Sequence, residues 1–250
     1  MPPLLPILGQ PFISFSELDS TNEEGRRLIE GDLAQSGMAI FTANQQRGKG
    51  QRGKSWTSTR DQGVALTLLI EPHFLTVSQQ FLLTGAVAIG VRNYLATLGG
   101  IPELFKIKWP NDILVDGKKI SGILIENNVR AGKVKSMIFG IGLNINQQSF
   151  LNLGATSMAL IRGFEFSIDE VSLQLTKEFN HWISFVGGDH KTLKLEYLKG
   201  LYGLNKNYRF KSQDQEFEGV IVGVNDCGEL EINMLGEIRT FKNKEISFLM

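Results

Sequence analysis

The sequence predicts an α+β fold, in which a mixed and largely antiparallel sheet is backed by helices and followed by a small β-barrel. Apolar segments with strand character alternate with long helical segments, and the pair Asp116-Gly117 is typical of a two-residue hairpin turn. After Gly203 the pattern changes to short alternating segments without a helical period. We therefore expect one domain at 1–203 and a second at 204–250.

The first hundred residues predict strands and helices in alternation. A short strand at 13–15 leads to a helix that starts at Ser20-Thr21-Asn22-Glu23-Glu24, where two capping boxes overlap, Ser20 with Glu23 and Thr21 with Glu24. Apolar strands follow at 38–43 and 64–70. A long helix at 77–98 begins after Thr76 and ends at Gly99-Gly100.

The second part of the chain predicts a hairpin, a further strand and two helices. The hairpin covers 106–126, and its Asp-Gly turn places Lys119 roughly opposite Leu114. A strand at 134–146 contains Gly140 and Gly142, and glycine inside a strand often marks a backbone that another group approaches closely. Amphipathic helices are expected at 167–186 and 191–198.

The composition is typical of a soluble cytoplasmic enzyme. Of 250 residues, 42% are hydrophobic, and Lys plus Arg equal Asp plus Glu at 26 each, so no global charge favours nucleic acid or membranes. The N-terminus lacks signal-peptide features, and the stretch 77–91 is shorter than the ~20 apolar residues of a membrane span. The lone Cys227 excludes an intrachain disulfide, and the histidines (His73, His181 and His190) lack metal-ligand spacing.

The segment 44–56, Asn-Gln-Gln-Arg-Gly-Lys-Gly-Gln-Arg-Gly-Lys-Ser-Trp, is the most informative in the chain. Its second half matches the phosphate loop of nucleoside triphosphatases, G-x-x-x-x-G-K-[ST], which requires a helix directly after the loop. Turn residues and the strand at 64–70 follow instead, so we exclude that class. Glycines for backbone freedom (Gly48, Gly50 and Gly53) and basic residues (Arg47, Lys49, Arg52 and Lys54) still predict a loop that folds over an anion.

Three other segments carry groups that suit a small polar ligand. Ser20-Thr21-Asn22 lies at a helix N-terminus, where free N–H groups bind anions, although a plain N-cap is the simpler interpretation. Lys108-Trp109-Pro110-Asn111-Asp112 leads into the hairpin that carries Lys118 and Lys119, which are alternatively only solvated. The run 140–146 is alternatively a central strand with a bulge. Each signal is weak alone.

Together and in this order, the four segments resemble the biotin–protein ligases, which attach biotin to carboxylase carrier domains. The resemblance extends from Ser20 to the C-terminus. It rests on Ser20-Thr21-Asn22, Gln45, Gly48-Lys49-Gly50, Arg52-Gly53, Trp56, the run Lys108 to Asp112, Lys119-Ile120, Gly122-Ile123-Leu124, Gly140, Gly142 and Asn144. It implies a class II synthetase-like catalytic domain with an SH3-like barrel. It also implies the short form of the family, because too few residues precede Ser20 for a DNA-binding domain.

The resemblance also implies the reaction. ATP activates the biotin carboxylate as biotinyl-5′-AMP with release of pyrophosphate, and a lysine ε-amine on a biotin carboxyl carrier protein then accepts the biotin. Two anions meet in the first step, so the site needs cations and N–H donors rather than a covalent nucleophile. Homodimers are common in the family.

The family pattern assigns a role to each matching residue. Those implied to bind biotin are Ser20, Thr21, Asn22, Gln45, Lys49, Gly50, Gln51, Lys119, Gly122, Gly140 and Gly142. Those near the nucleotide are Trp56, Asn111, Asn144 and Lys119, and the catalytic cations are Lys119, Lys49 and Arg52. Asp112 is the candidate ligand of Mg²⁺, because Mg²⁺ on a triphosphate usually takes one or two carboxylates.

One position departs from the family, and alternatives remain open. Gln51 stands where the family often has a further basic residue, so retention of the adenylate rests more on Lys49 and Arg52. Lipoate–protein ligases run the same adenylation on the same kind of fold, but the basic loop ending in Trp56 favours biotin. A non-catalytic biotin-binding module is the other alternative. The barrel is expected to frame either the nucleotide side or the carrier-protein docking surface.

Overall fold

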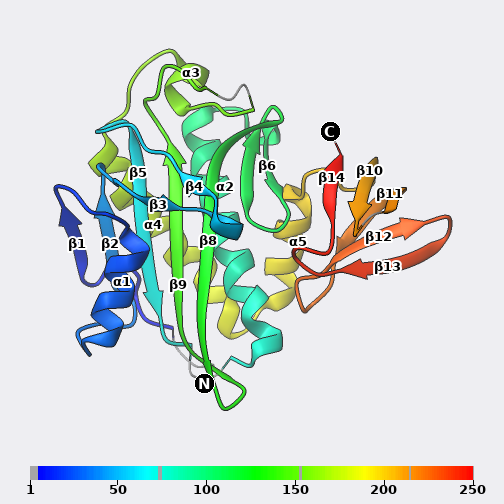
Figure 1. Cartoon of the computed structure of the whole chain (residues 1–250), viewed down its shortest axis with the longest axis horizontal. Coiled ribbons are helices and arrows are strands. Elements are labelled where there is room, and N and C mark those ends of the chain that lie inside the picture. The colour runs from blue at the N-terminus through cyan, green and yellow to red at the C-terminus, as the bar shows by residue number, and fades with distance from the viewer. Residues whose placement is uncertain (1–4, 73–74, 152–153, 214, 250) are drawn as a thin grey trace.

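A seven-stranded sheet forms the centre of the computed structural model, which describes residues 5–72, 75–151, 154–213 and 215–249 (Figure 1). Its strands are β1 Phe12–Phe15, β2 Ala39–Thr42, β5 Gly63–Ile70, β6 Phe105–Lys108, β7 Asp112–Val115, β8 Lys118–Arg130 and β9 Lys133–Asn144, in the order β1-β2-β5-β9-β8-β7-β6. β1 pairs with β2 in parallel, and the other neighbours are antiparallel. The predicted sheet type is confirmed.

Helices cover both faces of this sheet. They are α1 Thr21–Glu30, α2 Gln80–Gly99, α3 Met158–Arg162, α4 Ile168–Ile183 and α5 His190–Gly200. α1 packs on a small core of Met38, Ile40, Leu69 and Ile138, whereas α2 and α4 pack on the large core of the opposite face. Strand β5 is therefore buried along its whole length.

Helix α2 requires one correction. With the short 3₁₀ turn before it, the helix Val77–Gly99 has 23 residues, and by length and composition alone it passes as a membrane span. The uncharged stretch 77–91 is thus only part of a longer helix, which continues through Arg92 to Gly99. Its surroundings are nevertheless those of a core helix: a Cβ on Gly90 would lie 2.7 Å from Phe179 Cδ1 of α4. The buried Arg92 donates to the Phe105 carbonyl at 3.2 Å and pairs with Glu196 of α5 at 3.0 Å.

The hairpin prediction is confirmed in detail. Asp116 and Gly117 have φ values of 47° and 74°, as a two-residue turn requires, and Lys119 lies opposite Leu114. The start of α1 differs from the prediction. Ser20 caps the helix, but the Asp19 carboxylate accepts the backbone N–H of Ser20 at 2.7 Å. The Glu23 carboxylate instead accepts from Lys49 and Arg26. Neither capping box closes, because the acidic side chains pair with cations.

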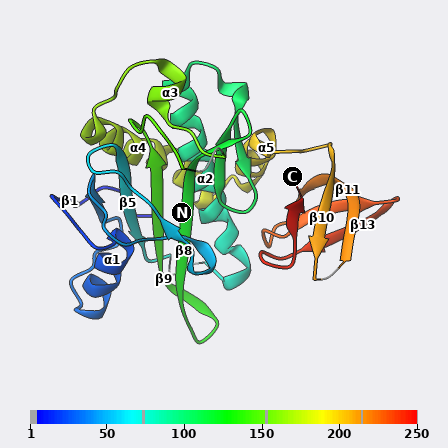
Figure 2. The ribbon, with the colours of Figure 1, turned by 45° about the horizontal axis from the view of Figure 1, so that its top comes forward.

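A second, five-stranded antiparallel sheet follows α5 and lies beside it (Figure 2). Its strands are β10 Asn207–Ser212, β11 Gln215–Val224, β12 Leu230–Met234, β13 Glu237–Phe241 and β14 Ser247–Leu249, in the order β13-β12-β11-β10-β14. The end strands β13 and β14 do not pair, so the predicted SH3-like barrel is an open one. Trp109 Nε1 donates to the Gly228 carbonyl at 2.9 Å and ties the β11–β12 turn to the large sheet. The domain boundary at 203/204 stays a prediction.

We expect Phe179→Ala to lower the free energy of unfolding by about 3–5 kcal/mol, because the fully buried ring fills the space beside Gly90. Leu173 on the same helix is 46% exposed, and Leu173→Ala should change stability by about 0.5 kcal/mol or less. Urea unfolding followed by circular dichroism measures both. Equal losses in the two variants would contradict this packing.

Candidate active site

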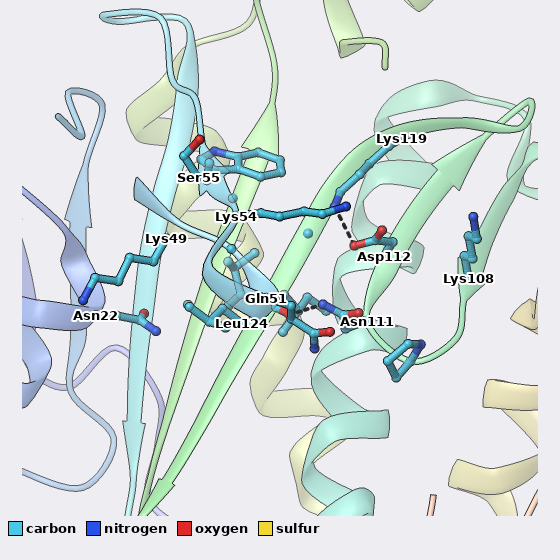
Figure 3. A pocket seen from close by; sticks show the side chains of 18 of the residues that line it. Asn22, Lys49, Gln51, Lys54, Ser55, Lys108, Asn111, Asp112, Lys119 and Leu124 are labelled. Atoms are coloured by element: carbon cyan, nitrogen blue, oxygen red, sulfur yellow. Dashed lines mark hydrogen bonds and ion pairs between the residues drawn. The ribbon is translucent and has the colours of Figure 1, made fainter. Parts of the chain in front are cut away.

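A cavity of ≈ 360 Å³ brings the predicted segments together (Figure 3). The predicted site residues that line it are Ser20, Thr21, Asn22, Gln45, Lys49, Gly50, Gln51, Trp56, Asn111, Asp112, Lys119, Gly122, Gly140 and Gly142. Asn144 is not among the lining residues; it is buried at the end of β9. The side chain of Arg52 lies outside the described residues. The predicted residues that line the cavity therefore come from four distant parts of the chain.

The loop 44–56 folds into a small hairpin over this cavity. β3 Gly48–Lys49 pairs with β4 Ser55–Trp56, and a 3₁₀ turn at Gln51–Gly53 joins them. A strand, β5, follows β4, so the exclusion of a phosphate-loop helix is confirmed. Gly53 has φ +75°, which favours glycine, whereas Gly50 has φ −113°, which any residue adopts. The prediction of required backbone freedom thus applies to Gly53 rather than Gly50.

Hydrogen bonds fix the polar side chains on the cavity floor. Gln45 Oε1 accepts from the Thr21 backbone N–H at 2.9 Å. Thr67, fully buried in the middle of β5, donates to Asn22 Oδ1 at 2.7 Å, and its Oγ1 lies 2.8 Å from Thr21 Oγ1. Asn22 Nδ2 donates to Glu126 of β8 at 2.9 Å. Both ends of the Asn22 amide are thus occupied, and its orientation is fixed.

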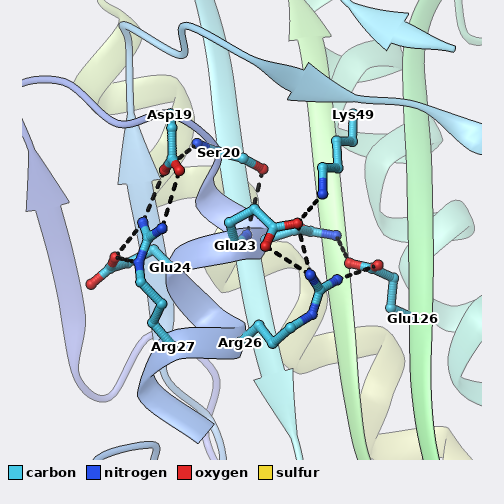
Figure 4. A network of polar contacts seen from close by, with 9 residues as sticks. Asp19, Ser20, Glu23, Glu24, Arg26, Arg27, Lys49 and Glu126 are labelled. Carbon is cyan, nitrogen blue, oxygen red and sulfur yellow. Dashed lines mark hydrogen bonds and ion pairs between the residues drawn. The ribbon is translucent and has the colours of Figure 1, made fainter. Parts of the chain in front are cut away.

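A chain of ion pairs connects this floor to the hairpin (Figure 4). Arg26 of α1 bridges Glu126 and Glu23, at 2.7 Å in each case. Glu23 also pairs with Lys49 of the hairpin. The hydrogen bond from Lys49 is the largest cause that holds the pKa of Glu23 below its usual range. Lys49 therefore contacts α1, and its carboxylate partner would compete with an anionic ligand for it.

Three glycines give β8 and β9 no side chains of their own at the site, so side chains of other elements pack directly on the strand backbone. A Cβ at Gly140 would collide with the Asn22 amide, and one at Gly142 would collide with the Trp56 indole. Gly122, the cross-strand partner of Gly142, lies under the same indole, with a Cβ-to-ring distance of 3.2 Å. The prediction that another group closely approaches this backbone is confirmed, and side chains of α1 and β4 are those groups.

Cationic side chains line the opposite wall. Lys119 Nζ pairs with Asp112 at 2.7 Å and lies 5.6 Å from the Trp56 ring. Hydrogen bonds with the segment 154–156 fix its backbone on both sides. Lys108 Nζ lies 5.1 Å from the Phe248 ring, and burial is the main cause that lowers its pKa, with a contribution from Lys119. Lys108 and Lys119 thus share this wall with the Asp112 carboxylate, and the three groups together leave it with net positive charge.

The comparisons with known proteins agree with this arrangement. A model of the biotin/lipoate A/B protein ligase family matches residues 15–144. The chain belongs to this family. The bifunctional ligase/repressor BirA of Bacillus subtilis (strain 168) is 30% identical over 234 residues, which are 90% of this chain and 70% of that protein. The biotin--[acetyl-CoA-carboxylase] ligase of Paracoccus denitrificans is 35% identical over 130 residues, 51% of each chain.

A solved structure extends the similarity to nearly the whole chain. The biotin protein ligase from Aquifex aeolicus in complex with biotin and ATP has a TM-score of 0.78 and 27% identity, and the match covers 95% of this chain and 98% of that one. The match reaches beyond the residues of the family model. It therefore includes most of the five-stranded sheet as well as the cavity.

Several lining or supporting residues were not predicted. Thr67 and Glu126 lie inside strand segments whose pattern carries no functional signal. Lys108 belongs to a recognised motif, but its partial burial is visible only in three dimensions. Asn243, Ile246, Ser247 and Phe248 approach the cavity from the second sheet, and no local motif marks them.

We expect Glu23→Gln to speed trypsin cleavage at the basic residues of the hairpin roughly two- to fivefold. The variant loses the ion pair with Lys49, which is half exposed, and such pairs contribute about 0.5–1 kcal/mol. Glu24→Gln is the matched control, because Glu24 pairs with Arg27 instead. Mass spectrometry of limited digests identifies the cut sites. Equal rates in both variants would contradict a role of this pair in holding the hairpin.

Proposed function

We propose that this member of the family is an ATP-dependent biotin–protein ligase. It activates biotin as biotinyl-5′-AMP and transfers it to a lysine of a biotin carboxyl carrier protein. The observation that carries the proposal is the single cavity that holds a fixed amide and hydroxyl cluster at one end and Lys119 at the other. The relatives and solved structures named for biotin ligation support it.

The geometry suits the two ends of biotin. The floor formed by Ser20, Thr21, Asn22 and Gln45 offers oriented donors and acceptors for the ureido ring, and the Trp56 indole packed on Gly142 offers an apolar surface for the bicyclic body. The valerate carboxylate then extends toward Lys119. An amide cluster of fixed orientation distinguishes a ureido group from an apolar ring, since a mismatched ligand leaves its buried polar groups unpaired.

The first step joins two anions. A carboxylate oxygen forms a bond to the α-phosphorus of ATP, and the bond to pyrophosphate breaks. Lys119, with Lys108 nearby, neutralises the charge that the two groups bring together, and the Trp56 hairpin excludes water. In the second step the carrier lysine amine attacks the acyl carbon, and AMP leaves with the bonding electrons.

The residues present fit Mg²⁺ only if the triphosphate of ATP supplies further oxygen ligands. Among the described residues no three His, Cys, Asp or Glu side chains gather into a metal site. Asp112 is the carboxylate that would hold Mg²⁺ or one of its waters, with phosphate oxygens completing the shell. When bound, the ion would shield charge on the pyrophosphate leaving group.

Lys119→Ala is expected to lower biotin-dependent pyrophosphate exchange about 10²- to 10³-fold, the usual effect of removing one stabilising charge from a transition state. Lys118→Ala is the matched control, because Lys118 precedes it on β8 but is exposed and does not line the cavity. Exchange of labelled pyrophosphate into ATP measures both. Full activity of Lys119→Ala would favour a non-catalytic biotin-binding module.

Gln51→Arg is expected to slow release of biotinyl-5′-AMP roughly fivefold, because a cation at the hairpin tip adds a charge-assisted hydrogen bond to the phosphate. Gln46→Arg is the control, since Gln46 is exposed and lies outside this cavity. Release is followed by trapping free adenylate after gel filtration. The same assay with lipoate tests the alternative: adenylation of lipoate but not biotin would overturn the assignment.

A further inference from the structure

Glu126 contacts the floor of the catalytic cavity from outside (Figure 4). It lies on β8 two residues beyond Leu124, which lines the cavity, whereas Glu126 does not. One oxygen of its carboxylate accepts from Asn22 Nδ2 at 2.9 Å, and the other accepts from Arg26 Nη2 at 2.7 Å. The carboxylate is thus placed to act on a ligand through Asn22 rather than by touching it.

The hydrogen bonds around Asn22 have a direction, and Glu126 sets it. A carboxylate accepts hydrogen bonds and cannot donate them, so Glu126 holds the NH₂ end of the Asn22 amide. The Asn22 Oδ1 end then faces Thr67, and the 2.7 Å contact between them uses the proton of the Thr67 hydroxyl. Because that hydroxyl has a single proton, its 2.8 Å contact with Thr21 Oγ1 requires the proton of the Thr21 hydroxyl.

The last hydroxyl in this series faces the ligand. Thr21 lines the cavity, and two protein oxygens compete for its proton: Thr67 Oγ1 at 2.8 Å and Gln45 Oε1 at 3.3 Å. Whichever oxygen takes the proton, Thr21 Oγ1 offers a ligand only lone pairs. An N–H group of a ligand therefore fits this position, whereas a carbonyl or ether oxygen would face another acceptor.

Arg26 makes this direction depend on the two acceptor oxygens of Glu126. A guanidinium only donates hydrogen bonds, so Arg26 requires an oxygen from its partner. In Glu126→Gln the one remaining oxygen faces Arg26, and the new NH₂ group faces Asn22. The Asn22 amide must then turn over to accept, and each hydrogen bond from Asn22 to Thr21 reverses. The Thr21 hydroxyl is then free to donate into the cavity.

We propose that Glu126 is a positioning residue that makes the cavity floor select a ligand N–H at Thr21. It acts through the Asn22 and Thr67 side chains and touches neither the ligand nor the reacting atoms. For biotin, the selected group is one of the two N–H groups of the ureido ring, and this identification rests on the proposed function. The direction of the hydrogen bonds does not.

Calorimetric titration of the full chain with biotin and with its two cyclic carbamate analogues tests the selection. In each analogue an oxygen replaces one ureido N–H, which changes a donor into an acceptor at nearly constant shape. The measured quantity is the ratio of the dissociation constant of each analogue to that of biotin. We expect Glu126→Gln to lower this ratio for one analogue about three- to tenfold, the usual effect of one hydrogen bond.

Two further variants separate positioning from a general loss of structure. Adding Arg26→Met to Glu126→Gln leaves the new amide free to turn its oxygen to Asn22, so the wild-type ratio should return. Arg26→Met alone keeps the carboxylate on Asn22 and should also keep the wild-type ratio. The proposal would be overturned if Glu126→Gln weakened biotin and both analogues equally, or if Arg26→Met restored nothing.

Neutron diffraction from crystals of the ligand-free protein tests the direction itself, because it locates hydroxyl protons that X-rays do not show. We expect the Thr67 proton to point to Asn22 and the Thr21 proton to point to Thr67. The opposite arrangement would overturn the role of Glu126. The expected arrangement in a protein that does not bind biotin would count against the proposed function while supporting that role.

Discussion

The bare surface of strand β9 is the constraint on which the site depends. Gly140 and Gly142 have no side chains, so Asn22 of α1 and Trp56 of β4 occupy the space where Cβ atoms would lie. These approaches bring a helix N-terminus and a loop hairpin onto the same central strand. Any larger residue at either glycine would move these groups away from the sheet, and the cavity between them would change shape.

A second constraint is electrostatic. In the proposed reaction the cavity binds a carboxylate and phosphates and so requires positive charge, whereas the chain as a whole has no net charge. Carboxylates of the protein neutralise the cavity's lysines while no ligand is bound: Asp112 pairs with Lys119, and Glu23 pairs with Lys49. Both pairs are partly exposed and therefore weak, so an incoming anion replaces the carboxylate at small cost.

The sequence predicts most of the architecture because its local signals agree with the packing. The Asp116-Gly117 turn sets the register of Lys119, and the strand after residue 63 excludes a phosphate loop. Where the prediction fails, a contact with a distant part of the chain overrides a local sequence pattern. Glu23 has the spacing of a capping box, but its carboxylate pairs with two cations. Helix α2 has the composition of a membrane span, yet the sheet and α4 bury it.

At the site itself, contacts between residues from distant segments could not be predicted from the sequence. The buried Thr67 fixes the Asn22 amide, and only the fold shows that the two residues meet: Thr67 pairs with Gly140 across β5 and β9, and the Asn22 amide lies over Gly140. The contact of the second sheet with the cavity is likewise visible only in the fold. The two expected roles of this sheet stay predictions, and what the structure shows is that Phe248 lies over Lys108 at the cavity wall. A ring there keeps Lys108 partly buried and its pKa low. That position makes the second sheet part of the electrostatics of the wall, beyond any part in docking a carrier.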